Sequence, residues 1–341
     1  MHTNDDHIHF VGLLSLNDPL YRYVCDSILP KLDWNGGDPE FNVFFYGGSH
    51  YVYKYEEKNK GCSFFIKFFG DDPIQVSWGE KRLRAYLEYE NLLRIRAYGF
   101  DKPPYHIAEP LGVAEWLNLA LVLRGYEGKT LVHYIHRAIQ EGRREKLFKK
   151  LSLLAGFLAA MHQRTITQKQ CVLEKCVHDL HKLVQSLRVQ EIINNSEEYE
   201  FLKAADSWAK RPYMKDDVNV MLHGDSTPPN FLFCREDIIA IDLENMHEGD
   251  RLYDLGRIAG ELKHFFYQYT GDRHRGEEFI SHFIHEYCSH FRDREGFLSS
   301  VTRRLPYYMA MTTLRIARNQ WIDRDYRRIL IDETFRIIWG Y

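Results

Sequence analysis

The chain has 341 residues, of which 45% are hydrophobic, 27% charged and 14% aromatic, and its formal net charge is -3. This composition is that of a folded globular protein long enough for two domains, and it argues against a disordered chain. The near-neutral charge gives no electrostatic reason to expect nucleic acid or an anionic membrane as a partner.

Nothing in the sequence indicates a membrane or secreted protein. No apolar run approaches the roughly 18–20 residues that span a bilayer, and the polar residues 1–10 do not resemble a signal peptide. The six cysteines are scattered without paired spacing, which is typical of reduced thiols. We therefore expect a cytoplasmic protein with no membrane contact, whose oligomeric state is left open.

The first third of the chain is rich in strand-like segments. Residues 11–33 predict one or two short helices, and a loop rich in Gly, Asn and Pro follows them. A longer helix is predicted over residues 81–98. Aromatic and β-branched runs predict strands at residues 41–46, 50–55, 63–69 and 119–123.

The remainder is mostly helical. Apolar residues at intervals of four and three, from Leu147 to Met161, predict a core-facing helix. Two short strands, at residues 231–234 and 238–241, bracket a polar turn, and the pattern is helical again from Leu255 onward. This change of character predicts two lobes, with a boundary between residues 123 and 124 and a nucleotide cleft between them.

The segment from His223 to Asp242 carries the most informative spacing. Asp225 and Asn230 lie five residues apart, and Asp242 follows twelve residues later at the end of a strand. Transfer of a phosphoryl group needs a carboxylate that orients the attacking hydroxyl, and oxygen ligands for the metal ions on the phosphates. Each residue alone is typical of a turn or a strand-end cap, but the series favours Asp225 as catalytic base, with Asn230 and Asp242 as metal ligands.

A lysine in the middle of an aromatic strand supports this interpretation. Lys67 lies within Phe64–Phe69, where burial needs an anionic partner. Nucleotide phosphates and a helix carboxylate would be such partners. Glu88 is the favoured carboxylate and Glu90 its rival. The alternative is a lysine on an edge strand, which would hinder aggregation.

Three further features are weaker. Gly47, Gly48 and Ser49 form a loop between two strands, where backbone N–H groups can approach phosphates, but a hairpin without a ligand has the same pattern. His223 is expected to orient the loop that bears Asp225. Asp254 is expected either to accept hydrogen bonds from that loop or to cap the next helix.

These segments resemble the aminoglycoside phosphotransferase and choline kinase-like family of small-molecule kinases. The resemblance rests on the glycine loop, Lys67, residues 88–92, the hinge-like residues 121–128, and the series from His223 to Asp254. It covers residues 40 to 330 loosely. The chain lacks a segment like the activation loop of protein kinases, and the long stretch between His162 and His223 favours the small-molecule branch.

The resemblance implies an α+β, bilobal protein-kinase-like fold. Its N-terminal lobe, residues 1–123, would hold an antiparallel sheet with one helix, preceded by an extension at residues 1–40, so that residues 41–123 clamp the nucleotide. The larger, mainly helical C-terminal lobe, residues 124–341, would hold the catalytic loop and the acceptor pocket. It also implies ATP, less often GTP, as the donor, Mg²⁺ as the metal, and adenine binding near Arg124 and Tyr126.

The leading hypothesis is thus an ATP- and Mg²⁺-dependent kinase that phosphorylates a hydroxyl of a small molecule. A sugar or amino-sugar is the favoured acceptor. The acidic residues between Glu191 and Asp217 would suit a cationic acceptor, such as an aminoglycoside or choline, if they formed a pocket, but they are more typical of a solvated helix face. One rival is a catalytically silent nucleotide-binding scaffold. Another is a metal-dependent hydrolase using His223 and Asp225, for which no further ligand set is evident.

Overall fold

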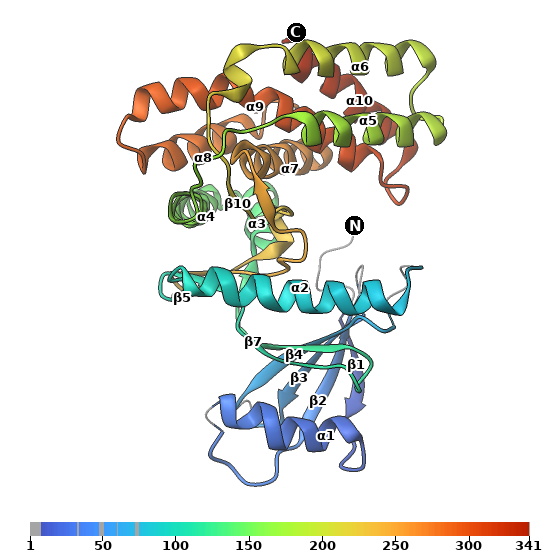
Figure 1. Cartoon of the computed structure of the whole chain (residues 1–341), viewed down its shortest axis with the longest axis vertical. Helices are drawn as coiled ribbons and strands as arrows, with labels where there is room; N and C mark the ends of the chain where they lie inside the picture. The colour runs from blue at the N-terminus through green and yellow to red at the C-terminus, as the bar shows by residue number, and fades with distance from the viewer. Residues whose placement is uncertain (1–7, 33, 48–50, 60, 72–74, 341) are drawn as a thin grey trace. The chain divides into compact units, whose positions relative to one another are not determined.

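The computed structural model describes residues 8–32, 34–47, 51–59, 61–71 and 75–340 (Figure 1). Contacts divide the chain into two compact units. The first unit comprises Met1–Lys129 and Leu232–Asn245, and the second comprises Thr130–Phe231 and Met246–Tyr341. The segment Leu232–Asn245 therefore groups with the N-terminal part of the chain although it lies far along the sequence.

The first unit is built on a six-stranded sheet in the order β1-β2-β3-β4-β8-β7, in which every neighbouring pair is antiparallel. The strand predicted at residues 41–46 has the expected bounds. The strands predicted to start at residues 50, 63 and 119 start within one residue of those positions. The strands are β1 (Ile8–Leu13), β2 (Phe41–Tyr46), β3 (Tyr51–Glu57), β4 (Ser63–Phe68), β7 (Pro110–Ala114) and β8 (Ala120–Arg124).

The N-terminal extension is part of this sheet and its core. The prediction of helix from residue 11 was wrong for residues 11–13, which lie in β1 and pair with β2. After β1, the chain forms α1 (Pro19–Tyr23), a π-helical turn (Val24–Ile28) and a 3-10 turn (Leu29–Leu32). Their apolar side chains pack against Phe41, Phe64 and Ile66 on one face of the sheet.

Helix α2 (Trp78–Ala97) covers the other face, as Figure 1 shows for α1 and α2 on opposite sides of the strands. It begins with a capping box between Ser77 and Glu80. The predicted apolar positions Leu83 and Leu87 are exposed, at 65% and 46%. The buried positions of α2 are instead Ala85, Glu88, Asn91, Leu92 and Ile95, so this helix presents a carboxylate and an amide to the interior.

A second sheet brings the returning segment into the first unit. Its strand order is β5-β6-β12-β11-β9, and β12 pairs in parallel with β6. Its strands are β5 (Asp101–Lys102), β6 (Tyr105–Ile107), β9 (Lys129–Thr130), β11 (Phe231–Cys234) and β12 (Asp237–Ala240). The chain then continues directly into Asp242.

The second unit is mainly helical. A two-stranded antiparallel pair, β10 (Val220–Leu222) with β13 (His247–Gly249), precedes the central helix α7. Helices α7 and α9 lie closely side by side. The helices are α3 (Leu131–Glu141), α4 (Arg144–Arg164), α5 (Glu174–Val189), α6 (Asn195–Ala209), α7 (Leu252–Thr270), α8 (Glu277–Ser289), α9 (Arg294–Ala317) and α10 (Arg324–Trp339).

None of the helices within the described residues is both long enough and apolar enough to cross a membrane.

Candidate active site

Lys67 lies at the centre of a cluster of carboxylates in the first unit. Successive residues of β4 point to opposite faces, so Ile66 joins the core under α1 while Lys67 faces α2. The Lys67 ammonium donates to Glu88 at 2.9 Å and to Asp242 at 2.7 Å, and Glu244 lies 3.5 Å away. Glu90 is exposed on α2, so the structure pairs Lys67 with Glu88 and not with its rival.

Burial and charge act in opposite directions on this cluster. Lys67 is 6% exposed and Glu88 1%. Burial lowers the pKa of Lys67, but Glu88, Asp242 and Glu244 outweigh it and hold that pKa well above its ordinary value. Burial, with Asp242 and Glu244 nearby, raises the pKa of Glu88 although Lys67 opposes the change. One ammonium thus balances three carboxylates only in part, which leaves an excess of negative charge.

The backbone around Asp242 directs its side chain into the cluster. Asp242 follows β12 with φ of +65°, a left-handed conformation that side-chain-bearing residues adopt at some cost. The Asn91 amide donates to the carbonyl of Leu243 at 2.9 Å, which fastens this turn to α2. Glu88 and Asn91 lie three residues apart on one face of α2. Glu88 therefore holds Lys67, and Asn91 holds the turn that carries Asp242.

The cluster has the donor set for a hard divalent cation. One carboxylate oxygen from each of Glu88, Asp242 and Glu244 lies within 4.8 Å of the other two. Mg²⁺ prefers such oxygen ligands, and its charge would offset the excess negative charge that Lys67 leaves. The residues present therefore fit a magnesium ion, with Glu244 joining Asp242 as a candidate ligand.

In the second unit, Asp254 anchors the loop that carries Asp225. The Asp254 carboxylate accepts the backbone N–H of His223 at 2.8 Å and that of Gly224 at 3.1 Å. Gly224 has φ of +78°, which favours glycine. Of the two roles considered for Asp254, the structure shows the hydrogen bonds to the loop.

A buried histidine, His162, contacts the Asp254 carboxylate. The Nε2 of His162 lies 3.2 Å from Asp254, and its Nδ1 lies 2.8 Å from the Tyr287 hydroxyl. Burial lowers the pKa of His162, so the ring is neutral, donates from Nε2 and accepts from Tyr287. Burial opposes ionisation of Asp254, but its hydrogen bonds with the His162 ring and with the His223 backbone help to lower the pKa of Asp254 to about 2. Asp254 is therefore a fixed anion that positions the loop.

Asp225 projects from this loop with its side chain 16% exposed. The Asn230 amide donates to the Asp225 carbonyl at 2.9 Å and to its carboxylate at 3.2 Å. Pro228 and Pro229 shape the short 3-10 turn that brings Asn230 back to Asp225. Both bonds use the Asn230 amide nitrogen, so its predicted role as a metal ligand falls to the side-chain oxygen.

His223 has a structural environment. Its side chain is fully buried and packs against Phe231 with ring centroids 5.2 Å apart. Its Nδ1 lies 3.4 Å from the backbone N–H of Asp225, so it helps to orient the loop. Among the described residues, His223 belongs to no group of His, Cys, Asp or Glu side chains that could hold a metal ion, which disfavours a metal-dependent hydrolase using His223.

The remaining predicted nucleotide residues lie in the first unit. Gly47 follows β2 and is exposed, whereas Gly48 and Ser49 lie outside the described residues. The Arg124 side chain pairs with Glu109, and its backbone N–H donates to the Glu109 carbonyl at 2.9 Å. The backbone N–H of Gly125 donates to the Ser63 carbonyl at 2.9 Å, so both of these main-chain donors are occupied.

Sequence reasoning missed two arginines beside Asp225. Arg315 of α9 lies 2.9 Å from the Asp225 carboxylate, and Arg257 of α7 lies 3.8 Å from it. Arg257 follows Asp254 by three residues, so a helix starting there would place both on one face. Arg315 lies 90 residues from Asp225 and has no local signal.

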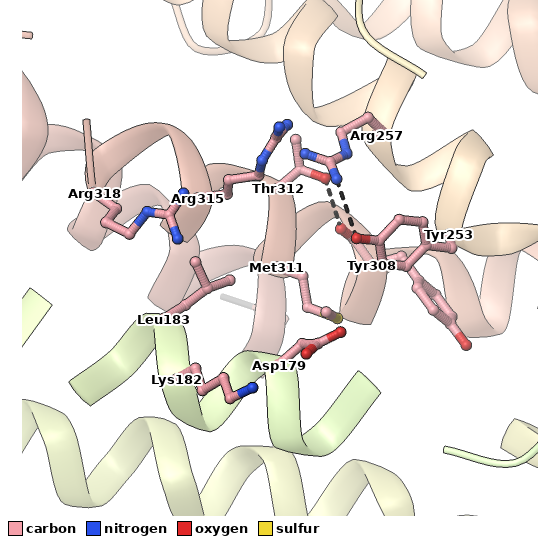
Figure 2. Close-up of a pocket in the computed structure, with 10 residues that line it drawn as sticks. All are labelled: Asp179, Lys182, Leu183, Tyr253, Arg257, Tyr308, Met311, Thr312, Arg315 and Arg318. Atoms are coloured by element: carbon pink, nitrogen blue, oxygen red, sulfur yellow. Dashed lines mark hydrogen bonds between the residues drawn. The ribbon is translucent and has the colours of Figure 1, made fainter. Parts of the chain in front are cut away.

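Both arginines line a cavity of about 200 Å³ in the second unit (Figure 2). Its walls come from α5, α7 and α9. Arg257 and Arg315 line this cavity and also contact the Asp225 carboxylate, so the cavity lies next to Asp225.

A comparison with known protein families matches residues 47–297, well over half of the chain, to the Phosphotransferase enzyme family. A comparison with curated proteins returned no match. An ethanolamine kinase from Plasmodium vivax shares the fold, with a TM-score of 0.63 and 13% identity over 94% of this chain and 88% of that chain.

Two other solved structures show the same similarity. A choline kinase from Cryptosporidium parvum has a TM-score of 0.62 and 11% identity over 94% of this chain and 95% of that chain. An ADP-bound aminoglycoside phosphotransferase has a TM-score of 0.57 and 11% identity over 94% and 98%. The expected kinase-like α+β fold is confirmed, and so is the expected class of small-molecule phosphotransferase. With residues 47–297 matched, the chain belongs to the phosphotransferase enzyme family.

Proposed function

We propose that this chain is an ATP- and Mg²⁺-dependent kinase that phosphorylates a hydroxyl group of a small molecule. The observation that carries the proposal is the cluster of Lys67 with Glu88, Asp242 and Glu244. A buried ammonium held by a helix carboxylate is the equipment that clamps the phosphates of a nucleotide. The ADP bound to one of the similar phosphotransferases supports a nucleotide donor.

The proposed roles follow from the contacts within each unit. Lys67 would bind the donor phosphates, while Glu88 fixes its position. Asp242 and Glu244 would hold Mg²⁺, which neutralises phosphate charge when bound, and Asn230 stays a predicted metal ligand. Backbone near Arg124 and Tyr126 would bind adenine, and Gly47, Gly48 and Ser49 would cover the phosphates. Residues 41–123 would thus clamp the nucleotide, and residues 124–341 would supply the catalytic loop and the acceptor pocket.

Asp225 would act on the acceptor. Its carboxylate orients the hydroxyl and takes its proton as the oxygen forms a bond to the γ-phosphorus. The bond from that phosphorus to the β,γ-bridging oxygen breaks, ADP leaves, and the proton passes from Asp225 to solvent. Asp254 and His162 would keep Asp225 in place through the backbone of residues 223 and 224.

A panel of sugars, amino-sugars, amino alcohols and nucleosides, assayed for acceptor-dependent ADP release with ATP or GTP, tests the proposal. Asp225→Asn should bind ATP normally and lose about 10²–10⁴-fold in turnover, the usual share of a general base. Asp216→Asn is the matched control, because this aspartate is exposed and its side chain makes no hydrogen bond or ion pair with the described residues. A full rate in Asp225→Asn would exclude Asp225 as the base.

A catalytically silent scaffold is the alternative outcome. Tight ATP binding without ADP release on any acceptor would favour it. The proposal also includes a cytoplasmic location, which is supported by the absence of disulfides among the six cysteines of the described chain.

A further inference from the structure

The side chains around the cavity beside Asp225 are predominantly basic. Lys182, Arg257, Arg315 and Arg318 line it, against one acidic residue, Asp179. Figure 2 shows these side chains gathered from α5, α7 and α9. A cation such as an amino-sugar would meet like charges here, whereas an anion would meet opposite ones.

Nearby carboxylates do not cancel this charge. Asp225 and Glu261 both interact with Arg257 from beside the cavity, which brings the acidic groups to three against four cations. Burial raises the pKa of Glu261 to about 7, so this carboxyl is only partly ionised near neutral pH. The side chains of Lys182 and Arg318 form no ion pair with any residue of the described chain.

Arg257 gives a second, independent indication of a ligand. Its side chain is 5% exposed, and its buried Nη1 lies 3.8 Å from the Asp225 carboxylate but makes no hydrogen bond among the described residues. The other terminal nitrogen donates to the Tyr253 hydroxyl at 3.1 Å, and the guanidinium lies 5.3 Å from the centre of the Tyr253 ring. Tyr253 therefore fixes the guanidinium, while Nη1 is left without a hydrogen bond among the described residues, because Asp225 is beyond hydrogen-bond distance.

Arg315 connects the cavity to the proposed base. It is 34% exposed, lines the cavity, and donates to the Asp225 carboxylate at 2.9 Å. An anionic group bound in the cavity would give Arg315 a second partner beside Asp225. A hydroxyl on the same molecule would then lie within reach of the Asp225 carboxylate.

We infer that the acceptor carries an anionic group, a carboxylate or a phosphate, in addition to the hydroxyl that receives the phosphoryl group. This inference rests on the proposed function and refines it. Arg257, Arg315, Arg318 and Lys182 bind the anionic group, and Asp225 acts on the hydroxyl. The cavity, about 200 Å³, is smaller than the roughly 300–1,000 Å³ of pockets for drug-sized ligands, which favours a compact acceptor.

One scaffold in four charge states tests the inference. Glucose, gluconate, glucose 6-phosphate and glucosamine are compared by kcat/KM for acceptor-dependent ADP release, with glycerol, glycerate and glycerol 3-phosphate as a second series. Charge-assisted contacts should favour the anionic members by about 10- to 100-fold over their neutral counterparts. Lys182→Gln and Arg318→Gln should each reduce that preference, while Arg137→Gln, an arginine of α3 outside the cavity, should leave it unchanged.

Calorimetric binding of the same compounds, with Mg²⁺ and a non-hydrolysable ATP analogue present, separates the inference from the proposed function. Anions that bind more tightly than their neutral counterparts, and more weakly to Arg318→Gln, support the inference even if no transfer occurs. Such a result without transfer counts against the kinase. Phosphorylation of glucosamine or glucose in preference to the anions overturns the inference and leaves the kinase intact. Equal or absent binding of all compounds overturns it as well.

Discussion

Arg304 of α9 and Asp217 form an ion pair in the interior of the second unit, with their charged atoms 2.9 Å apart. The other terminal nitrogen of Arg304 lies 2.9 Å from Asp250, and its side chain is 1% exposed. Asp217 precedes β10 and Asp250 follows β13, so one guanidinium joins both strands, at the same end of this antiparallel pair, to α9. The loop that carries Asp225 begins directly after β10.

Replacing Arg304 by leucine should destabilise the protein strongly. Two buried carboxylates would lose their shared guanidinium, although Asp217 keeps Arg251 and Asp250 keeps the Tyr308 hydroxyl. Breaking a buried pair costs about 3–5 kcal/mol. Urea denaturation should show this loss in the free energy of unfolding. Arg303→Leu, at the exposed neighbouring position, is the control and should change stability by less than about 0.5 kcal/mol. Equal losses in the two variants would contradict the structural role of Arg304.

Magnesium alone should stabilise the protein through the carboxylates around Lys67. An ion that binds only the folded state at ten times its dissociation constant adds about 1.4 kcal/mol to stability. Differential scanning calorimetry should show a higher Tm with MgCl₂ than with NaCl of equal ionic strength. The increase should disappear in Asp242→Asn and persist in Asp216→Asn. An unchanged increase in Asp242→Asn would place the ion elsewhere.

Gly256→Ala should force α7 and α9 apart. A methyl group at this position would lie 2.3 Å from the Tyr308 Cβ and 2.8 Å from its backbone carbon, which is closer than atoms can pack. Overpacking of this kind costs about 1–3 kcal/mol, and it should also raise KM for the acceptor because both helices line the cavity. Gly37→Ala, where nothing lies within 4 Å, is the control. Normal stability in Gly256→Ala would show that the helices can separate freely.

His264 should make stability depend on pH between about 4 and 6.5. Burial lowers the pKa of this ring from 6.5 to about 4. The unfolded chain therefore binds more protons than the folded protein in that range, so stability rises with pH, by about 3 kcal/mol in total for this residue. The gain is complete above pH 6.5 and is lost as the pH falls toward 4.

Chemical denaturation at pH 4.5, 5.5, 6.5 and 7.5 measures this slope. His264→Gln should flatten it, whereas His274→Gln, at an exposed position, should retain it. The Tyr326 hydroxyl donates to the His264 carbonyl at 3.1 Å and lies 3.1 Å from Nδ1, so a neutral ring can donate back to it. An identical slope in both variants would assign the pH dependence to other groups.

Local patterns predicted the elements well where one face of a segment meets the core. Strand β2 has the predicted bounds because its run of aromatic and β-branched residues pairs with neighbouring strands over its whole length. The sequence also predicts a charged partner for Lys67, because a lysine inside such a strand is buried. Strand β1 was missed because its residues are largely exposed, and pairing with β2 rather than burial makes it a strand.

Long-range charge pairs could not be predicted. Asp217 belonged to an acidic stretch that favoured either a solvated face or a pocket for cations. It is instead buried against Arg251 and Arg304, from distant parts of the chain. Arg315 reaches Asp225 only because α7 and α9 pack closely, and nothing in the local sequence reports that contact. The predominantly basic lining of the cavity therefore could not be predicted from the sequence.

The return of Leu232–Asn245 to the first unit has a consequence for synthesis on the ribosome. The first unit lacks β11, β12 and Asp242 until residue 245 of 341 has been made. At about 5–20 residues per second, more than a hundred residues of the second unit are translated before that happens. A fragment ending at Lys129 would leave β6 without its parallel partner and Lys67 without Asp242. The N-terminal unit therefore cannot be expressed as a shortened gene, and its completion depends on the chain that follows it.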